Sequence, residues 1–392
     1  MKKFAKKILL IFWLASICEG SAISASAQMP PGEPVKYPKK LEIIITNPLD
    51  AARINEPVII PLAEIIKRAP DFNRNFFRVK RSANEGFEPL DLPSQIRLVP
   101  AAGYSEELAF QVNLAPKERK IISLIYNPAG TVLPGYPARA QAFERWYTGG
   151  VNVAWENEVN AYRSYSGVVD YFAKSFEHLR LHDLPPDSYH HEAAWGVDPF
   201  VIGKKPGLCG VALVSGNTLT PCYGGRDSLL FVHRAFGGGA VLSGAVVKAL
   251  DKGELLLEET YTLFNGRHDN HVRIVPARKI PVLAVGMQRN DRETARFEER
   301  AGYFVSWAPA GEYGTIAHIL VFRPEDYLGR EDILEGHFVK LKPAADGSFS
   351  YLSLGAWHRV SADQPESFEP LVKHAQHLAQ CFANPVKVEF SR

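Results

Sequence analysis

The 392-residue chain lacks the short motifs by which many enzymes are recognised. It contains no G-x-S-x-G, no H-E-x-x-H, no phosphate-binding loop and no dinucleotide-binding fingerprint. Its most glycine-rich stretch, FGGGAV at residues 236–241, is not followed by Lys-Ser or Lys-Thr, so it predicts a tight turn. The chemistry that these motifs support is therefore not expected.

The chain also lacks an excess of charge of one sign. Its formal charge is +2, and residues 1–27 contain four lysines and one glutamate, so the remainder is near −1. A nucleic-acid-binding protein usually carries a basic footprint, and this chain has none. We expect no nucleic-acid partner, and an anionic ligand would have to be bound by a few local cations.

Long apolar runs are absent after the N-terminus. Basic residues at positions 2–7 precede the apolar run Ile8–Ile17, which is too short to span a bilayer, and Ala25-Ser26-Ala27 offers a small-x-small cleavage site. Residues 1–27 are therefore predicted to be a cleavable signal peptide. The mature protein is expected to be periplasmic or secreted, without membrane insertion.

Cysteine is scarce, and only Cys209, Cys222 and Cys381 follow the predicted cleavage site. The stretch LCGVALVSGNTLTPCYG predicts a hairpin that turns near Ser215-Gly216-Asn217. One register would place Cys209 opposite Cys222 and allow a disulfide in an exported protein. Buried free thiols are the alternative, and the spacing does not resemble a zinc site.

Strand patterns predict an all-β protein with two domains. Short β-rich runs bounded by turn residues occur at 40–47, 95–100, 108–114 and 120–127, which is typical of a small β-sandwich. A linker rich in proline and glycine follows, so we place the boundary near Pro134, with domains at 28–135 and 136–392. Further strands are predicted at 254–264, 270–276, 302–309, 315–322 and 337–343. They predict a large antiparallel β-sandwich, supersandwich-like, with one C-terminal helix that ends before Asn384-Pro385.

The richest stretch for chemistry runs from residue 155 to 210. If WENEVNAYRSY is one strand, alternation puts Trp155, Asn157 and Arg163 on one face. The next predicted strand puts Asp170 and Lys174 together, between aromatic residues. Such a mixture suits a sugar-binding groove, and an ion pair on a solvated face is the alternative.

A loop with titratable groups follows these strands. Tyr189, His190, His191 and Asp198 lie in it, and loops carry function more often than cores do. A zinc site made by two upstream histidines, His178 and His182, with His190 or His191 is a minority alternative because the spacing fits no compact zinc motif.

Four stretches occur in an order that resembles a known family: NPLDAAR, WENEVNAYRSY, YHHEAAWGVDPFVIGKKPGLCG and FSYLSLGAWHR. The chain is similar over nearly its whole mature length to exported bacterial proteins that are catalogued as a domain of unknown function and are found in polysaccharide-utilisation clusters. One branch resembles the ulvan oligosaccharide dehydratases, which eliminate water from a terminal uronic acid. This chain has His191 where the family pattern has lysine.

The resemblance implies a carbon–oxygen lyase that acts on a uronic-acid-containing oligosaccharide and needs no organic cofactor. Elimination requires a base, an acid and a group that holds the carboxylate. His190 is then the base, Tyr189 the acid, and Arg163 with Lys174 the carboxylate clamp. Asp198 or Asp170 would orient the imidazole.

The remaining candidates complete this hypothesis. His337 is an alternative catalytic residue, and Trp155, Asn157, His191 and Trp357 are expected to contact the sugar. No metal ligand is assigned, although a divalent metal stays an alternative. A non-catalytic sugar-binding protein and a glycoside hydrolase with paired carboxylates are the competing functions.

Overall fold

The computed structural model describes residues 36–81, 90–99, 105–147, 150–184, 189–224, 228–358 and 368–391. The predicted signal peptide lies outside the described residues. The described chain folds into antiparallel β-sheets with two α-helices, so the all-β prediction is confirmed. None of its helices is both long and apolar enough to cross a membrane.

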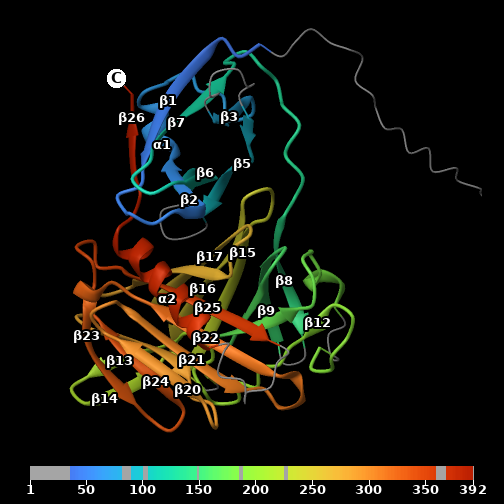
Figure 1. Cartoon of the computed structure of the whole chain (residues 1–392). Coiled ribbons are helices and arrows are strands. Elements are labelled where there is room, and N and C mark those ends of the chain that lie inside the picture. Colours follow the sequence, from blue (N-terminus) through green and yellow to red (C-terminus); the bar gives the residue numbers. More distant parts are fainter. Residues whose placement is uncertain are drawn as a thin grey trace, which may run out of the picture. The chain divides into compact units, whose positions relative to one another are not determined.

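Two sheets form a first sandwich, which includes both the first and the last strand of the described chain (Figure 1). Apolar residues of both sheets, among them Ile43, Val58, Phe110 and Leu124, form its core. The last strand of the chain pairs with the first, Ile43 opposite Phe390. In spatial order, one sheet contains β26 (Lys387–Phe390), β1 (Lys39–Thr46), β7 (Arg119–Tyr126), β3 (Phe77–Arg81) and β4 (Leu90–Leu92), and the other contains β2 (Arg53–Pro61), β6 (Ser105–Leu114) and β5 (Ser94–Val99). The short helix α1 (Leu62–Ile66), which the sequence did not predict, follows β2.

The larger part of the chain is built on an eight-stranded sheet with a five-stranded sheet beside it. In spatial order, the eight strands are β15 (Leu229–Gly237), β16 (Leu242–Asp251), β17 (Glu254–Phe264), β18 (Asp269–Pro276), β25 (Phe349–His358), β22 (Thr315–Val321), β21 (Tyr303–Pro309) and β20 (Thr294–Glu298). The five are β14 (Thr218–Pro221), β13 (Gly210–Ser215), β19 (Leu283–Gln288), β24 (Gly336–Leu341) and β23 (Tyr327–Asp332). The predicted helix is present as α2 (Phe368–Ala383), which packs on β21 and β22.

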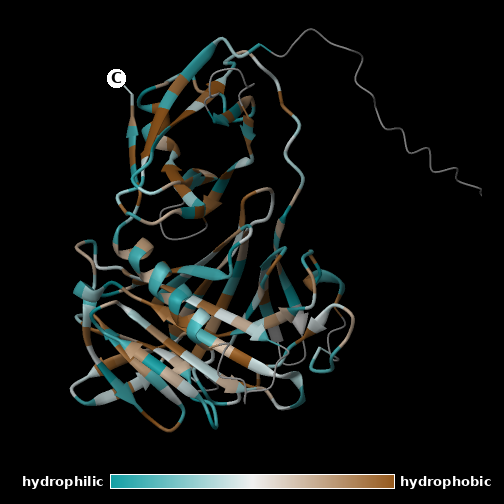
Figure 2. Cartoon of the chain, viewed as in Figure 1, coloured by the Kyte–Doolittle hydropathy of each residue, from teal (hydrophilic) through white to brown (hydrophobic). Residues whose placement is uncertain are grey.

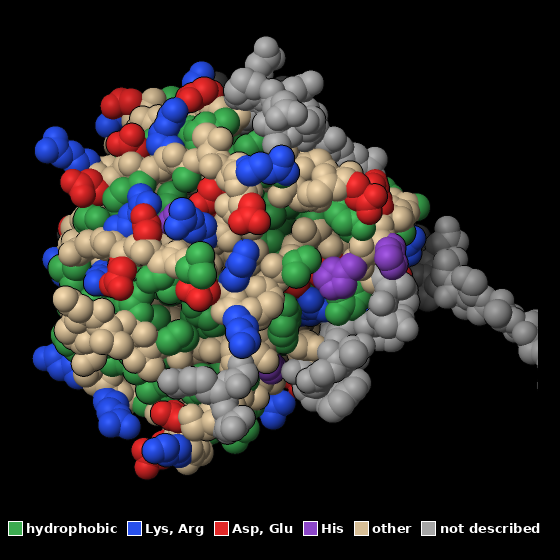
Figure 3. All heavy atoms as spheres, turned by 90° about the horizontal axis from the view of Figure 1, so that it is seen from below, with side chains coloured by type: hydrophobic (Ala, Val, Ile, Leu, Met, Phe, Trp, Pro, Cys, Tyr) green, Lys and Arg blue, Asp and Glu red, His purple; other side chains and the backbone are tan. Residues whose placement is uncertain are grey.

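A third sheet carries most of the candidate residues. Its strands are β12 (Gly196–Val197), β11 (Val168–Lys174), β10 (Ala161–Tyr165), β9 (Gly150–Asn157) and β8 (Ala140–Tyr147). Apolar residues lie mostly in the strands, where they are brown in Figure 2. On the face drawn in Figure 3, acidic and basic side chains are interspersed, in agreement with the balanced charge of the sequence.

The segment WENEVNAYRSY is a hairpin and not one strand, which corrects the predicted faces. The side-chain oxygen of Asn157 accepts hydrogen bonds from the backbone N–H groups of Val159 and Asn160, and these bonds close the turn between β9 and β10. Tyr162 therefore pairs with Trp155, and Arg163 pairs with Ala154. Cross-strand partners share a face, so Arg163 and Trp155 lie on opposite faces of the sheet.

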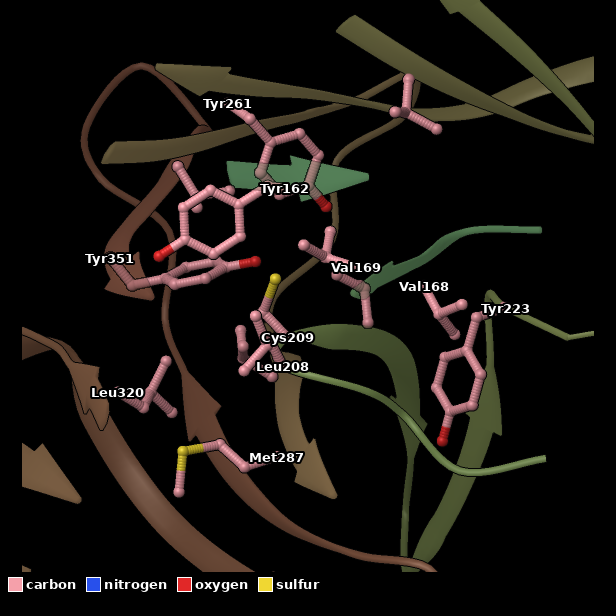
Figure 4. Close-up of a cluster of buried hydrophobic side chains, with 14 of the residues drawn as sticks. Tyr162, Val168, Val169, Leu208, Cys209, Tyr223, Tyr261, Met287, Leu320 and Tyr351 are labelled. Carbon is pink, nitrogen blue, oxygen red and sulfur yellow. The ribbon is translucent and has the colours of Figure 1, made fainter. Parts of the chain in front are cut away.

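The inward face of this sheet joins the main core. Tyr162 lies there with Tyr261, Tyr351 and Cys209 in a buried cluster (Figure 4). The predicted hairpin turn is present, because Ser215 pairs with Thr218. Cys209 and Cys222 are both buried free thiols, so the disulfide alternative is not realised in this structure.

Candidate functional site

Arg163 lies at the centre of a buried polar cluster on the outward face of β10. Its Nη2 donates a hydrogen bond of 2.7 Å to Asp170, its cross-strand partner on β11, and lies 3.5 Å from the carboxylate of Asp198. Arg163 is 4% exposed, and the two aspartates are also buried. One guanidinium group therefore interacts with two carboxyl groups that are shielded from water.

Three aromatic rings enclose the same guanidinium group. Its central carbon lies 4.7 Å from the ring centroid of Tyr165, 5.1 Å from that of Phe172 and 4.7 Å from that of Tyr189. The Tyr189 hydroxyl also interacts with Arg163 by a hydrogen bond. These cation–π contacts fix the orientation of Arg163 and couple it to the loop that carries Tyr189.

His190 lies at the solvent side of this cluster. Its Nδ1 is 3.2 Å from the backbone carbonyl of Asp198 and 3.6 Å from the Asp198 carboxylate, while its side chain is 52% exposed. The backbone N–H of Asp198 donates to the carbonyl of Tyr189 at 2.9 Å, which ties the two parts of the loop together. A half-exposed imidazole thus rests on a buried carboxyl group.

Burial sets the protonation of the two aspartates. Desolvation raises the pKa of Asp198 well above its ordinary range, and the nearby charge of Asp170 raises it further. Desolvation also raises the pKa of Asp170, although the charge of Arg163 opposes this. Burial lowers the pKa of Arg163, but the charges of Asp170 and Asp198 outweigh this effect and raise its pKa overall. The aspartates titrate as a pair and keep a proton more readily than free carboxylates do.

The arrangement can perform proton transfer at His190. A carbonyl oxygen only accepts hydrogen bonds, so Nδ1 carries the proton when it donates to the Asp198 carbonyl. Nε2 then keeps its lone pair and can act as a base. Tyr189 lies beside it, with ring centroids 4.6 Å apart, so a second proton-transfer group is adjacent.

Tyr313 is also part of this cluster, although no pattern in the sequence indicated it. Its hydroxyl donates a hydrogen bond of 2.8 Å to the backbone carbonyl of His190. Its own carbonyl accepts a hydrogen bond of 2.6 Å from the indole of Trp357 on β25. Trp357 is therefore linked to His190 through Tyr313, while His191 is exposed in the loop.

Three of the expected site residues do not lie at the surface of the Arg163 cluster: Trp155, Asn157 and Lys174. Trp155 is 0% exposed, stacks with Tyr162 and Tyr261 and donates to Asn270, so neither face of its indole is open to a sugar. We assign it to the core. Asn157 is likewise buried and holds the β9–β10 turn.

Lys174 is committed to partners within the fold. Its ammonium group pairs with buried Glu156 and donates to the backbone carbonyls of Asn157 and His178. The side chain is 3% exposed, so its charge is not available to hold a substrate carboxylate directly. Burial lowers its pKa, and the charge of Glu156 opposes this effect.

His337 belongs to a different cluster, on β24. Its Nδ1 lies 2.8 Å from Asp332, and its Nε2 contacts Glu293, so both ring nitrogens have carboxylate partners. Desolvation opposes protonation, but the hydrogen bonds to Glu293 and Asp332 raise the pKa of His337 overall. Both ring nitrogens are engaged by carboxylates within the fold, and these partners are not residues of the Arg163 cluster.

The zinc alternative finds no support in the geometry. Among the residues that the structure describes, no group of three or more His, Cys, Asp or Glu side chains is arranged to hold a metal ion. His178 stacks on Phe176 with ring centroids 4.2 Å apart, and His182 pairs with the neighbouring Asp183.

Comparison with known proteins identifies a family but no activity. The family model described as "Domain of unknown function (DUF4861)" matches residues 45–388. No curated protein matches the sequence. This confirms the predicted resemblance to a family of unknown function, while its link to polysaccharide clusters and to the dehydratases stays a prediction.

Solved structures resemble the chain only distantly. An α-mannosidase from Enterococcus faecalis V583 is 9% identical, with a TM-score of 0.45, and the match covers 90% of this chain and 46% of that chain. A glycosyl hydrolase family 38 protein from Enterococcus faecalis is 9% identical, with a TM-score of 0.44 and coverage of 90% and 47%. YidC from Thermotoga maritima is 15% identical, with a TM-score of 0.34 and coverage of 61% and 57%. The chain spans about half the length of these structures, and likenesses this weak carry no argument about activity.

Proposed function

The chain belongs to the DUF4861 family, and from the geometry around His190 we propose that it is a carbohydrate-active enzyme that uses His190 for acid–base catalysis. The observation that carries this proposal is the half-exposed imidazole of His190 resting on the buried carboxyl group of Asp198. His190 thus combines solvent access with a buried carboxyl group, an arginine and a tyrosine beside it, and such clusters of titratable groups are typical of functional sites.

The finer proposal is β-elimination at a uronic acid, as the sequence resemblance implies. Nε2 of His190 removes the proton at C5, and the electron pair forms the C4–C5 double bond. The C4–O bond breaks, and the Tyr189 hydroxyl gives its proton to the leaving oxygen, so that a dehydratase releases water. Arg163 stabilises the tyrosinate that results, because its guanidinium group contacts Tyr189.

In this mechanism Arg163 acts on Tyr189 and is not a direct clamp for the substrate carboxylate. The group is buried, and two aspartates already share its charge. Lys174 is buried in the same way. Both contribute by fixing the sheet face under the loop, which differs from the role that the sequence suggested.

A glycoside hydrolase with Asp170 and Asp198 as its carboxylate pair is not favoured. A hydrolase needs both carboxyl groups open to the glycosidic bond. Here both are buried and turned toward Arg163.

Export of the protein through the predicted signal peptide is part of the proposal, because its substrates are extracellular polysaccharide fragments.

The test is to incubate the purified protein with saturated uronyl oligosaccharides and to follow the absorbance of the C4–C5 double bond. The native protein should form product, and His190→Ala should lower the rate by about 10²–10⁴-fold. His182→Ala, which alters an exposed histidine paired only with Asp183, is the matched control and should keep full activity. Binding of the oligosaccharide without any product would favour the binding protein instead, and full activity in His190→Ala would reject the assigned base.

A further inference from the structure

A cavity of about 280 Å³ lies apart from the His190 site and shares no residue with it. Three segments that are distant in the sequence form its wall: the start of β2, the turn between β17 and β18, and α2. Its size is close to the lower end of the range for small-molecule sites, about 300–1,000 Å³. The polar side chains that line it include Arg53, Arg267, His268, His374 and His377.

The local structure explains why these side chains converge. His374 and His377 are three positions apart on α2 and therefore project from the same side of the helix. The β17–β18 turn approaches β2 closely at Gly266, whose φ is 64°, and a Cβ atom there would lie 2.7 Å from the side chain of Asn55. The turn thus places Arg267 and His268 opposite the helix.

Two arginines are fixed in the wall by the fold. The Arg53 side chain is fully buried, and it donates to Asn47 at 2.9 Å and to Glu56 at 2.6 Å. Arg267 makes a double hydrogen bond to Asp269, at 3.1 Å and 2.9 Å. Each arginine has one carboxylate partner. The positive and negative charges of the cavity wall therefore balance as long as the histidines are neutral.

The three histidines make few polar contacts with the rest of the described fold. In the described part of the chain, the side chains of His268 and His374 have no hydrogen-bond partner, and the His377 Nε2 lies 3.7 Å from the Cys381 sulfur. Desolvation lowers the pKa of all three imidazoles, and the charge of Arg267 lowers each of them further, although Asp269 opposes this at His268 and His374 and Glu56 does so at His377. Neutral donors and acceptors therefore surround the cavity, next to the two arginine–carboxylate pairs.

We infer that this cavity is a second binding site, which takes a small oxyanion such as a carboxylate or a sulfate group. Arg267 supplies a fixed charge, and the three imidazoles supply hydrogen-bond donors from two directions. A bound anion stabilises protonated imidazole, so binding takes up protons and strengthens as the pH falls. This inference does not depend on the proposed activity at His190.

Isothermal titration calorimetry of the full chain tests the inference with three probes: inorganic sulfate, glucuronate and glucose. Sulfate, glucuronate or both should bind more tightly at pH 6 than at pH 8, with proton uptake seen in buffers of different ionisation enthalpy, and glucose should not bind at this site. Preference for sulfate indicates a site for the anion alone, and preference for glucuronate indicates a carboxylated sugar. The double variant His374→Gln/His377→Gln should bind at least about tenfold more weakly, since charge-assisted hydrogen bonds are worth ~1.5–3 kcal/mol.

Two controls separate this site from the His190 site. His182→Gln should bind the anions as the native protein does, and so should His190→Ala, which alters a half-exposed side chain of the other site. Both helix histidines lie at least partly exposed on α2, so their replacement should leave the far-ultraviolet circular dichroism unchanged. Failure of both anions to bind at pH 6, equal binding of glucose, or unchanged affinity in the double variant would overturn the inference.

Discussion

Arg163 and Asp170 form a buried ion pair across strands β10 and β11, with 2.7 Å between Nη2 and the carboxylate. The pair exists because the two residues are opposite each other in the antiparallel register and point to the outward face. The loop that contains Tyr189, His190 and Asp198 covers that face. The position of this loop therefore depends on the Arg163–Asp170 pair.

Replacing Arg163 with lysine should lower both stability and activity although it keeps the charge. One ammonium group cannot contact both aspartates and also lie flat against three rings. Each lost hydrogen bond to a charged group is worth ~1.5–3 kcal/mol, which urea unfolding at neutral pH can measure. Arg234→Lys is the control, because its guanidinium group is 62% exposed and such surface pairs contribute only about 0–1 kcal/mol. Equal stability of the two variants would contradict the role of Arg163.

Glu259 should make the protein less stable as the pH rises. Burial raises its pKa to about 7, although a hydrogen bond with Tyr261 opposes this. The folded state then holds a proton that the unfolded state loses near the ordinary value of 4.5, so stability falls between 4.5 and about 7 and changes no further above that range. Glu259→Gln should be relatively more stable at pH 8 than at pH 5.

Urea unfolding of the Glu259→Gln variant and the native chain at a series of pH values measures this difference. Because other groups titrate identically in both proteins, only the difference between them reports on Glu259. Tyr261 lies in the buried cluster of Figure 4, two positions after Glu259 on β17, and its hydroxyl can donate to the side-chain oxygen of glutamine as it does to that of Glu259. A difference that does not vary with pH would show that Glu259 has the same pKa in the folded and unfolded states.

Tyr313→Phe should slow turnover without changing substrate affinity. The variant loses only the hydroxyl that donates to the His190 carbonyl at 2.8 Å. A neutral hydrogen bond contributes about 0.5–1.5 kcal/mol, so kcat should fall by about two- to tenfold while KM stays the same. Tyr327→Phe on β23 is the control. A change in KM alone would mean that Tyr313 contacts the substrate and does not position His190.

Local patterns predicted the strands well where the strands are long. The run 254–264 is β17 itself, and the runs 270–276 and 315–322 agree with β18 and β22 to within one residue at each end. The strand β26 was not predicted, because it has four residues and pairs with β1 at the other end of the chain. Pairing over such a distance leaves no periodic pattern in the sequence.

The candidate site was predicted only in part, because some of its contacts also join residues that are distant in the sequence. Tyr189, His190 and Arg163 were singled out from the strand and loop patterns, their roles followed from the family resemblance, and the structure places them together. Trp155 was grouped with Arg163 because the β9–β10 segment reads as one alternating strand. The turn depends on hydrogen bonds from the Asn157 side chain, which residue alternation does not show. Tyr313 lies 123 positions from His190 in sequence, so only the folded chain brings them into contact.

Chemical rescue tests most directly whether His190 transfers protons. His190→Gly removes the imidazole from a half-exposed loop position, so added imidazole can enter the space and replace it. We expect His190→Gly to be inactive on saturated uronyl oligosaccharides, and imidazole to restore formation of the C4–C5 double bond in proportion to its free-base concentration. Absence of rescue in a correctly folded variant that still binds the oligosaccharide, or full activity without imidazole, would contradict the proposal that His190 is the catalytic base.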